Sequence, residues 1–97
     1  MTLQSFNTSL AQNHPPSGVS MPLQSLWWAR KGDWDKAHKL VMDDSSREAA
    51  WVHAYLHRVE GDLPNARYWY RQAALPAADG TLDGEWTAIT EALLARE

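Results

Sequence analysis

The chain of 97 residues is shorter than the ~100–200 residues of an ordinary domain, so we expect one small hydrophobic core rather than a cleft between two lobes. Nine basic residues against twelve acidic ones give a net charge of -3, which argues against the clustered positive surface that nucleic-acid binding requires. Cysteine is absent, which excludes disulfides and thiolate metal sites, and no apolar run reaches the roughly 18 residues of a membrane-spanning helix.

The N-terminal part of the chain differs in composition from the rest. Its first 29 residues contain no Asp, Glu, Lys or Arg, and small polar residues and proline dominate its beginning. We therefore predict a disordered, flexible tail over residues 1–19 and a single helical domain over residues 20–97. An alternative stays open, because the i, i+3, i+7 spacing of Leu3, Phe6 and Leu10 is also typical of a short helical turn that packs on a neighbour.

From Ser20 onward the sequence has the start and stop signals of helices. Ser20 is a favourable N-cap for a first helix over about 22–31, and Gly32 ends it because glycine adopts the left-handed conformation at the C′ position without strain. Asp33 then caps a second helix that ends near Asp43.

Three further helices follow. Ser45 and Glu48 have the spacing of a capping box, which predicts a third helix over about 46–60. Asp62 caps a fourth helix that ends before Pro76, and a fifth is predicted over about 84–96. The fold class is therefore all-α.

A Gly-Asp pair occurs twice, at Gly32-Asp33 and 29 residues later at Gly61-Asp62. In each pair glycine permits a tight reversal of the chain and aspartate caps the returning helix. The repetition predicts two antiparallel helical hairpins, with the last helix as a C-terminal cap on them. These four residues are interpreted as structural turns.

The helix of the second copy reads Ala66-x-x-Trp69-Tyr70-x-x-Ala73-Ala74. This pattern resembles the Sel-like branch of the tetratricopeptide helical-repeat superfamily, over about residues 22–76. The resemblance implies stacked hairpins that bind a protein or peptide. Because the first copy has Leu40-Val41 in place of Trp-Tyr, and its offset is shorter than the ~34 residues of a tetratricopeptide unit, a free-standing five-helix domain stays an alternative. Residues 53–70 also resemble a group of small uncharacterised bacterial and fungal proteins, which implies no activity.

Three polar residues follow one strip of the third predicted helix, namely His53, His57 and Glu60 at i, i+4 and i+7. Two histidines at this spacing can chelate a divalent metal ion through their ring nitrogens, and a carboxylate one turn later can complete part of the ligand set. His38, from the preceding helix, is a possible third imidazole. Solvated or packed histidines and general acid–base chemistry are the alternatives.

Arg58 falls inside the apolar sector of the same helix, where an unpaired guanidinium would be costly. It is therefore either a structural residue, paired with a carboxylate such as Asp33 or Asp62, or a group that grasps an anionic ligand. Tyr68 and Asn65 lie opposite the apolar stripe of the fourth helix, where a tyrosine is either simply exposed or part of a contact surface. The candidate binding surface therefore comprises His53, His57, Arg58, Asn65 and Tyr68.

The pattern as a whole favours a binding protein rather than an enzyme, because no catalytic triad, phosphate-binding loop or cofactor motif is present. Our leading hypothesis is a module for a protein or peptide partner. The alternatives are a small-ligand- or metal-binding protein, or an enzyme, that uses the polar strip around His53, His57 and Arg58, and an accessory subunit. Since two hairpins are few for a helical array, we also expect a homodimer. Without a basic, apolar secretory leader, the chain is expected to be cytoplasmic, with no membrane and no nucleic-acid partner.

Overall fold

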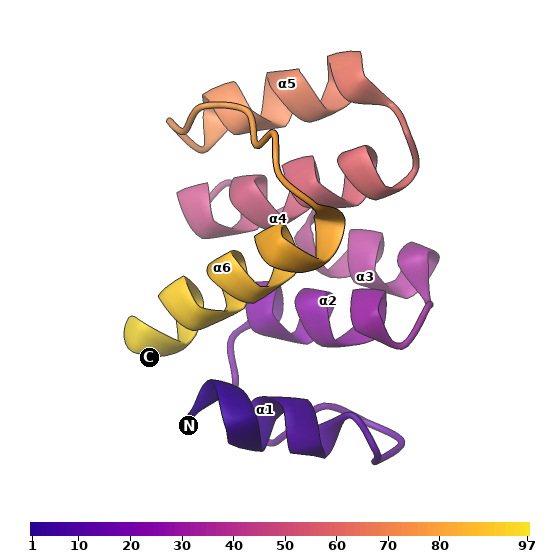
Figure 1. The fold of residues 1–97 in the computed structure, drawn as a ribbon, viewed down its shortest axis with the longest axis vertical. Helices are drawn as coiled ribbons and strands as arrows, with labels where there is room; N and C mark the ends of the chain where they lie inside the picture. Colours follow the sequence, from indigo (N-terminus) through magenta and orange to yellow (C-terminus); the bar gives the residue numbers. More distant parts are fainter.

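The computed structural model describes residues 1–97 as an all-α structure of six helices without strands (Figure 1). The helices are α1 (Leu3–Ser9), α2 (Met21–Arg30), α3 (Trp34–Val41), α4 (Arg47–Val59), α5 (Leu63–Gln72) and α6 (Leu82–Ala95). The all-α prediction is confirmed. None of the helices combines the length and hydrophobicity that crossing a lipid bilayer would require.

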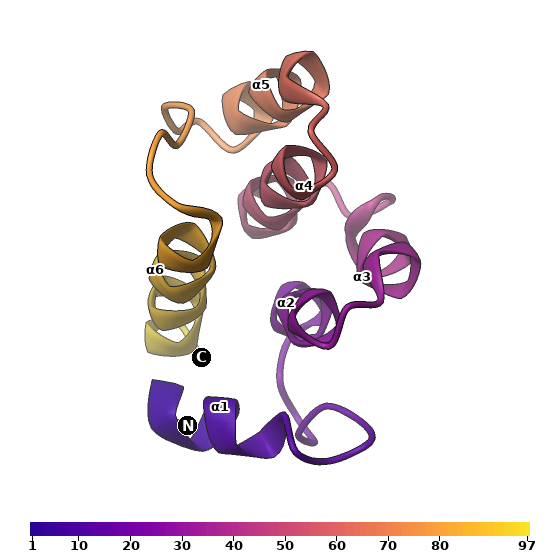
Figure 2. The ribbon, with the colours of Figure 1, turned by 45° about the vertical axis from the view of Figure 1, so that its right-hand side comes forward.

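Helices α2 to α5 are stacked in chain order, and the closest packing is between α2 and α3 and between α4 and α5. Figure 2 shows these four helices as a curved column. Helix α6 lies on the concave side of this column, and α1 lies across the end next to α2. Helix α6 does not continue the column beyond α5, as a terminal cap would. It packs instead on α2 and α4, because Trp86 and Ile89 fill the space between the two hairpins and are fully buried there.

Both Gly-Asp pairs form the predicted corners. Gly32 and Gly61 have φ angles of +89° and +86°, in the left-handed region that glycine adopts without a Cβ clash. The backbone N–H of Asp33 donates to the carbonyl of Trp28, which completes a Schellman motif at the end of α2. The carboxylates of Asp33 and Asp62 each accept a backbone N–H from the first turn of the following helix.

The capping box predicted for the third helix was wrong by one residue. Ser46, not Ser45, is the N-cap of α4 and accepts the backbone N–H of Ala49, while Asp44 accepts the N–H of Ser46. Glu48 is therefore free to pair with Arg96 at the C-terminal end of α6. Two adjacent serines offer equivalent caps in the sequence, and the path of the preceding loop selects between them.

The prediction of a disordered tail over residues 1–19 was wrong. Residues Leu3–Ser9 form α1, capped by reciprocal bonds between Thr2 and Ser5, and the ring of Phe6 is completely buried 6.1 Å from that of Trp86. The alternative interpretation of the Leu3, Phe6 and Leu10 spacing therefore describes this segment, since Leu3 and Leu10 also pack on the core. A segment without charged side chains buries such a face without desolvating any charge.

Polar contacts fix the segment after α1 to the domain as well. The indole N–H of Trp27 donates to the hydroxyl of Ser9 at 3.0 Å, and the ammonium of Lys31 donates to the carbonyls of Leu10 and Gln12. Trp27 lies on α2 and Lys31 follows the end of this helix, so both side chains are well separated in sequence from the residues of the N-terminal segment that they contact. The N-terminal segment is therefore part of the single domain rather than an appendage to it.

A third corner of the same kind ends α5, but alanine occupies the position that glycine takes in the other two. Ala74 has a φ of +60°, and the N–H of Leu75 donates to the carbonyl of Tyr70 as in the other corners.

We expect Ala74→Gly to raise the free energy of unfolding by roughly 0.5–1 kcal/mol, because the left-handed conformation strains an L-residue with a Cβ atom. Urea denaturation measures the change. Ala77→Gly in the same loop, at an alanine without a positive φ, is the control and should not stabilise; equal effects of the two substitutions would contradict the explanation.

Candidate metal centre between the two hairpins

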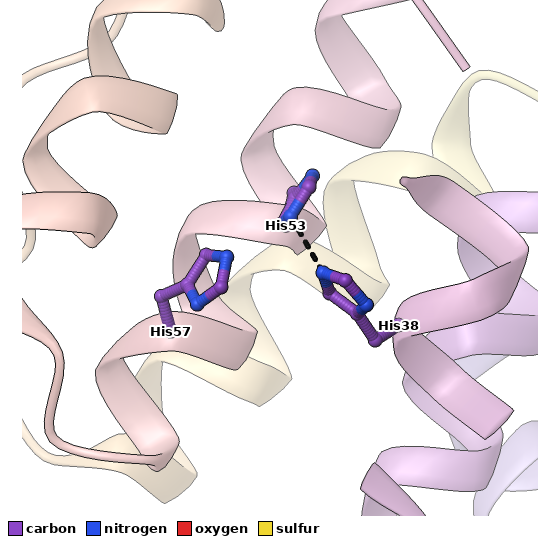
Figure 3. A group of neighbouring side chains, drawn as sticks. All are labelled: His38, His53 and His57. Atoms are coloured by element: carbon purple, nitrogen blue, oxygen red, sulfur yellow. Dashed lines mark hydrogen bonds between the residues drawn. The ribbon is translucent and has the colours of Figure 1, made fainter. Parts of the chain in front are cut away.

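Three histidine side chains meet between α3 and α4 (Figure 3). His53 and His57 lie one turn apart on α4, and His38 reaches across from α3, so the cluster draws residues from both hairpins. The Nε2 atoms of His38 and His53 are 3.0 Å apart, and one ring nitrogen of each histidine lies within 4.8 Å of the others. The ring centroids of His53 and His57 are 4.8 Å apart, so these two rings lie side by side on one face of α4.

Two tryptophans enclose the cluster. The indole of Trp34 on α3 stacks on the ring of His38 at a centroid distance of 4.8 Å, and the indole of Trp69 on α5 stacks on His53 at 4.0 Å. Trp34 is itself held in place because its N–H donates to the carbonyl of Leu56 at 2.7 Å. His53 and His57 are only 4% and 6% exposed as a result, so their rings have little freedom to rotate.

The hydrogen bonds of the cluster leave nitrogen lone pairs directed into it. Nδ1 of His57 lies 2.5 Å from a carboxylate oxygen of Glu60, so Nδ1 carries the proton in the neutral form of the ring and Nε2 is then the acceptor. Between His38 and His53 one Nε2 must donate and the other accept, since both rings cannot share the contact as donors. The remaining nitrogen of His53, Nδ1, is buried and has no hydrogen-bond partner.

The surroundings favour the neutral form of two of the three rings. Burial, together with the nearby His57 and His38, lowers the pKa of His53 to about 4. Burial and His57 also lower the pKa of His38, although Glu60 and Asp35 act in the opposite direction. Near neutral pH these two imidazoles are therefore uncharged, which is the form that coordinates a metal ion.

The lowered pKa of His53 predicts acid sensitivity of the metal-free protein. Between the ordinary value of 6.5 and about 4, the unfolded chain binds a proton that the folded chain does not, so stability is complete above pH 6.5 and falls as the pH drops towards 4. We expect the free energy of unfolding to decrease by roughly 1–2 kcal/mol between about pH 7.5 and about pH 5, as measured with urea in the presence of a chelator.

His53→Gln should make this pH dependence shallower, whereas His14→Gln, at an exposed histidine in the loop before α2, should leave it unchanged. A pH dependence that is the same in both variants would show that groups other than His53 cause the loss of stability.

The structure brings together only some of the residues that the sequence singled out. His53 and His57 lie in the cluster with His38, the histidine that the sequence indicated as a possible third imidazole. Glu60 does not join the three rings, but it lies with Asp62 beside His57, where its carboxylate orients the ring. Asn65 and Tyr68 are on α5 outside the cluster, and Tyr68 is 46% exposed.

Arg58 points away from the histidines, although it follows His57 directly in the chain. Its guanidinium donates to a carboxylate oxygen of Glu85 at 2.9 Å and to the carbonyl of Gly80. Glu85 also accepts a hydrogen bond from the hydroxyl of Tyr70. Burial and this hydrogen bond raise the pKa of that tyrosine. The partner of Arg58 is therefore a carboxylate on α6, rather than Asp33 or Asp62.

Trp34 and Trp69 also belong to the site, although the sequence did not indicate them as site residues. The signal for Trp34 was present, because it precedes His38 by four residues and therefore lies on the same face of the helix. No spacing rule indicates Trp69, since α5 meets His53 only after the second hairpin has closed. Both tryptophans belong to the site because they exclude water from the rings on which they stack.

Comparisons with protein-family models, with curated proteins and with solved structures found no match to this chain.

Proposed function

We propose that this protein binds a divalent transition-metal ion of the zinc class through His38, His53 and His57. The observation that carries the proposal is the convergence of three largely buried imidazoles from two hairpins, each with one ring nitrogen within 4.8 Å of the others.

The distances in the cluster are compatible with such an ion. A tetrahedral zinc ion with nitrogen ligands at about 2.0–2.1 Å separates those nitrogens by roughly 3.3 Å. The Nε2 atoms of His38 and His53 are already 3.0 Å apart, and the third nitrogen lies within 4.8 Å of them, so binding requires the rings to draw closer together by at most about 1.5 Å. Imidazole ligands suit zinc, copper and nickel better than magnesium or calcium, which prefer oxygen.

The carboxylate of Glu60 supports the same function. A histidine that coordinates a metal through one nitrogen usually donates its other N–H to a carboxylate or carbonyl, which fixes the ring and raises its basicity. His57 makes this contact with Glu60. Because the ligands lie on α3 and α4, a bound ion would join the two hairpins and stabilise the folded state.

The test is a calorimetric titration of the metal-free protein with zinc chloride. We expect one ion per chain, a dissociation constant in the micromolar range or below, and an affinity at least about tenfold weaker in His38→Gln. His38 is the matched choice because it is the least buried of the three, so its replacement disturbs packing least. His14→Gln controls for adventitious binding by an exposed histidine. No heat with the wild-type protein, or equal heat with His38→Gln, would rule the metal site out.

Zinc should also raise the melting temperature of the wild-type protein. An ion at about one hundred times its dissociation constant adds about 2.7 kcal/mol to the free energy of unfolding. The stabilisation should be absent in His38→Gln. Stabilisation of both proteins by zinc would point to binding elsewhere on the chain.

A protein or peptide partner is the second candidate function. It rests on the resemblance of residues 22–76 to tetratricopeptide and Sel-like repeats, and on the face of α5 opposite the buried Ala66 and Tyr70, where Tyr68 is 46% exposed. A homodimer that covers this face is the simplest form of the proposal. Analytical ultracentrifugation tests it: a protein that stays monomeric at about 0.5 mM would exclude the dimer, which at that concentration needs only modest affinity.

A further inference from the structure

A second site lies on the other side of α4 from the histidines. A cavity of about 300 Å³ opens between α4, α5 and α6, beneath the loop that joins α5 to α6. Trp51, Tyr70 and Leu75 supply much of its apolar lining, and Gly84 and Ala88, one turn apart on α6, leave space because their side chains are absent or small. This volume is at the lower end of the range for small-molecule pockets.

The ionisable carboxyl groups that line this cavity are both acidic. Its lining contains two carboxylates, those of Asp79 and Glu85, and no lysine, arginine or histidine. The charge of Glu85 is balanced by Arg58, which is not a lining residue and whose guanidinium lies 2.9 Å from the Glu85 carboxylate. Asp79 has no ion-pair or hydrogen-bond partner in the structure, so the cavity has one uncompensated negative charge at its mouth.

From this arrangement we propose that the cavity binds a small organic ammonium ion with an aromatic or alkyl body. The hydrocarbon part would pack against Trp51 and Leu75, and the ammonium group would lie near Asp79, where the aromatic rings of the lining also attract a cation. Carboxylates disfavour an anionic ligand at this place, and the apolar walls disfavour a hydrated metal ion. Arg96 lies 6.0 Å from the Trp51 ring, but it lines a neighbouring cavity rather than this one.

The site is open to solvent at the exposed loop, so its affinity depends on hydrophobic contact and on a single partly screened charge. For a ligand as small as 2-phenylethylammonium we expect a dissociation constant on the order of 1 mM. The site is therefore tested better by comparing ligands of different charge than by the affinity for one ligand.

The experiment compares three probes of similar shape, namely 2-phenylethylammonium, 2-phenylethanol and 3-phenylpropionate, by two-dimensional NMR of the ¹⁵N-labelled full chain. We expect the ammonium to shift the backbone amides of Gly80 and Gly84 and the indole N–H of Trp51. The alcohol should bind about threefold more weakly and the carboxylate at least about tenfold more weakly. Equal affinity for the three probes, no binding of the ammonium at about 10 mM, or shifts confined to other parts of the chain would each overturn the proposal.

Two variants locate the site. Ala88→Phe, at an exposed position of the lining, should fill the cavity and weaken ammonium binding at least about tenfold while the dispersed NMR spectrum shows that the chain is folded. Asp79→Asn should reduce the affinity for the ammonium to that of the alcohol, and Asp43→Asn, an exposed carboxylate on the loop between α3 and α4, should not. Unchanged binding by Ala88→Phe, or equal losses with the two Asp→Asn variants, would contradict the assignment.

Discussion

Arg58→Met is expected to lower the free energy of unfolding by about 3 kcal/mol. The substitution keeps much of the side-chain volume but leaves the carboxylate of Glu85, only 5% exposed, with the hydroxyl of Tyr70 as its remaining partner. Removing one member of a buried ion pair leaves the other charge desolvated and uncompensated, which is among the most costly changes in a small domain. For a chain of this length the loss corresponds to a fall in melting temperature of more than about 10 °C.

The matched control is Arg96→Met, which breaks the pair with Glu48 at the protein surface. Both members of that pair are about half exposed, so the loss should be below about 1 kcal/mol. The double variant Arg58→Met/Glu85→Gln should recover part of the stability, because it removes the isolated charge. If Arg58→Met lowers the free energy of unfolding no more than Arg96→Met does, then Arg58 is not the structural residue that its contacts indicate. Binding of an anionic ligand then becomes the better explanation of Arg58.

Phe6→Ala is the second substitution with a large expected effect, a loss of about 3–5 kcal/mol in the free energy of unfolding. The ring of Phe6 is completely buried against Trp86, and its removal leaves a cavity among α1, α2 and α6 that rigid neighbours cannot fill. The indole N–H of Trp27 also depends on this helix, because its acceptor is the hydroxyl of Ser9. Equilibrium urea unfolding, followed by tryptophan fluorescence, measures the effect.

Gln4→Ala provides the control on the same helix. Gln4 is exposed, so its truncation should change stability by less than about 0.5 kcal/mol. The pair of variants also tests the corrected description of the N-terminus: a disordered segment would give a negligible loss for both. A loss with Phe6→Ala alone requires that α1 is folded onto the domain in solution.

Local signals in the sequence were sufficient to predict the five helices α2 to α6, but not α1. The corners at Gly32 and Gly61 require a left-handed residue followed by a cap, and both requirements are met by adjacent side chains without help from the rest of the fold. The same logic fails at Ala74, where the third corner has no glycine to indicate it. Backbone hydrogen bonds from Ala74 to Arg71 and from Leu75 to Tyr70 close this corner, and no residue type in the local sequence indicates it.

The sequence predicted one part of the candidate metal centre, the pair of histidines on α4, but not the packing that completes it. The i, i+4 spacing of His53 and His57 places both rings on one face of α4 whatever surrounds them. The selection of His38 as the third ring depends on how closely α3 packs on α4, and the position of Arg58 depends on α6, which returns to pair with it through Glu85.

The sequence by itself determined where the chain turns and which side chains share a face of each helix, because capping and helical periodicity act over a few residues. The tertiary structure alone decided that α1 is ordered, that α6 lies against α2 and α4, and which polar groups meet. These outcomes depend on contacts between segments far apart in the chain, such as Phe6 with Trp86 and Arg58 with Glu85. The free energy of such contacts comes from burial and desolvation, which are properties of the assembled fold rather than of any local stretch of sequence.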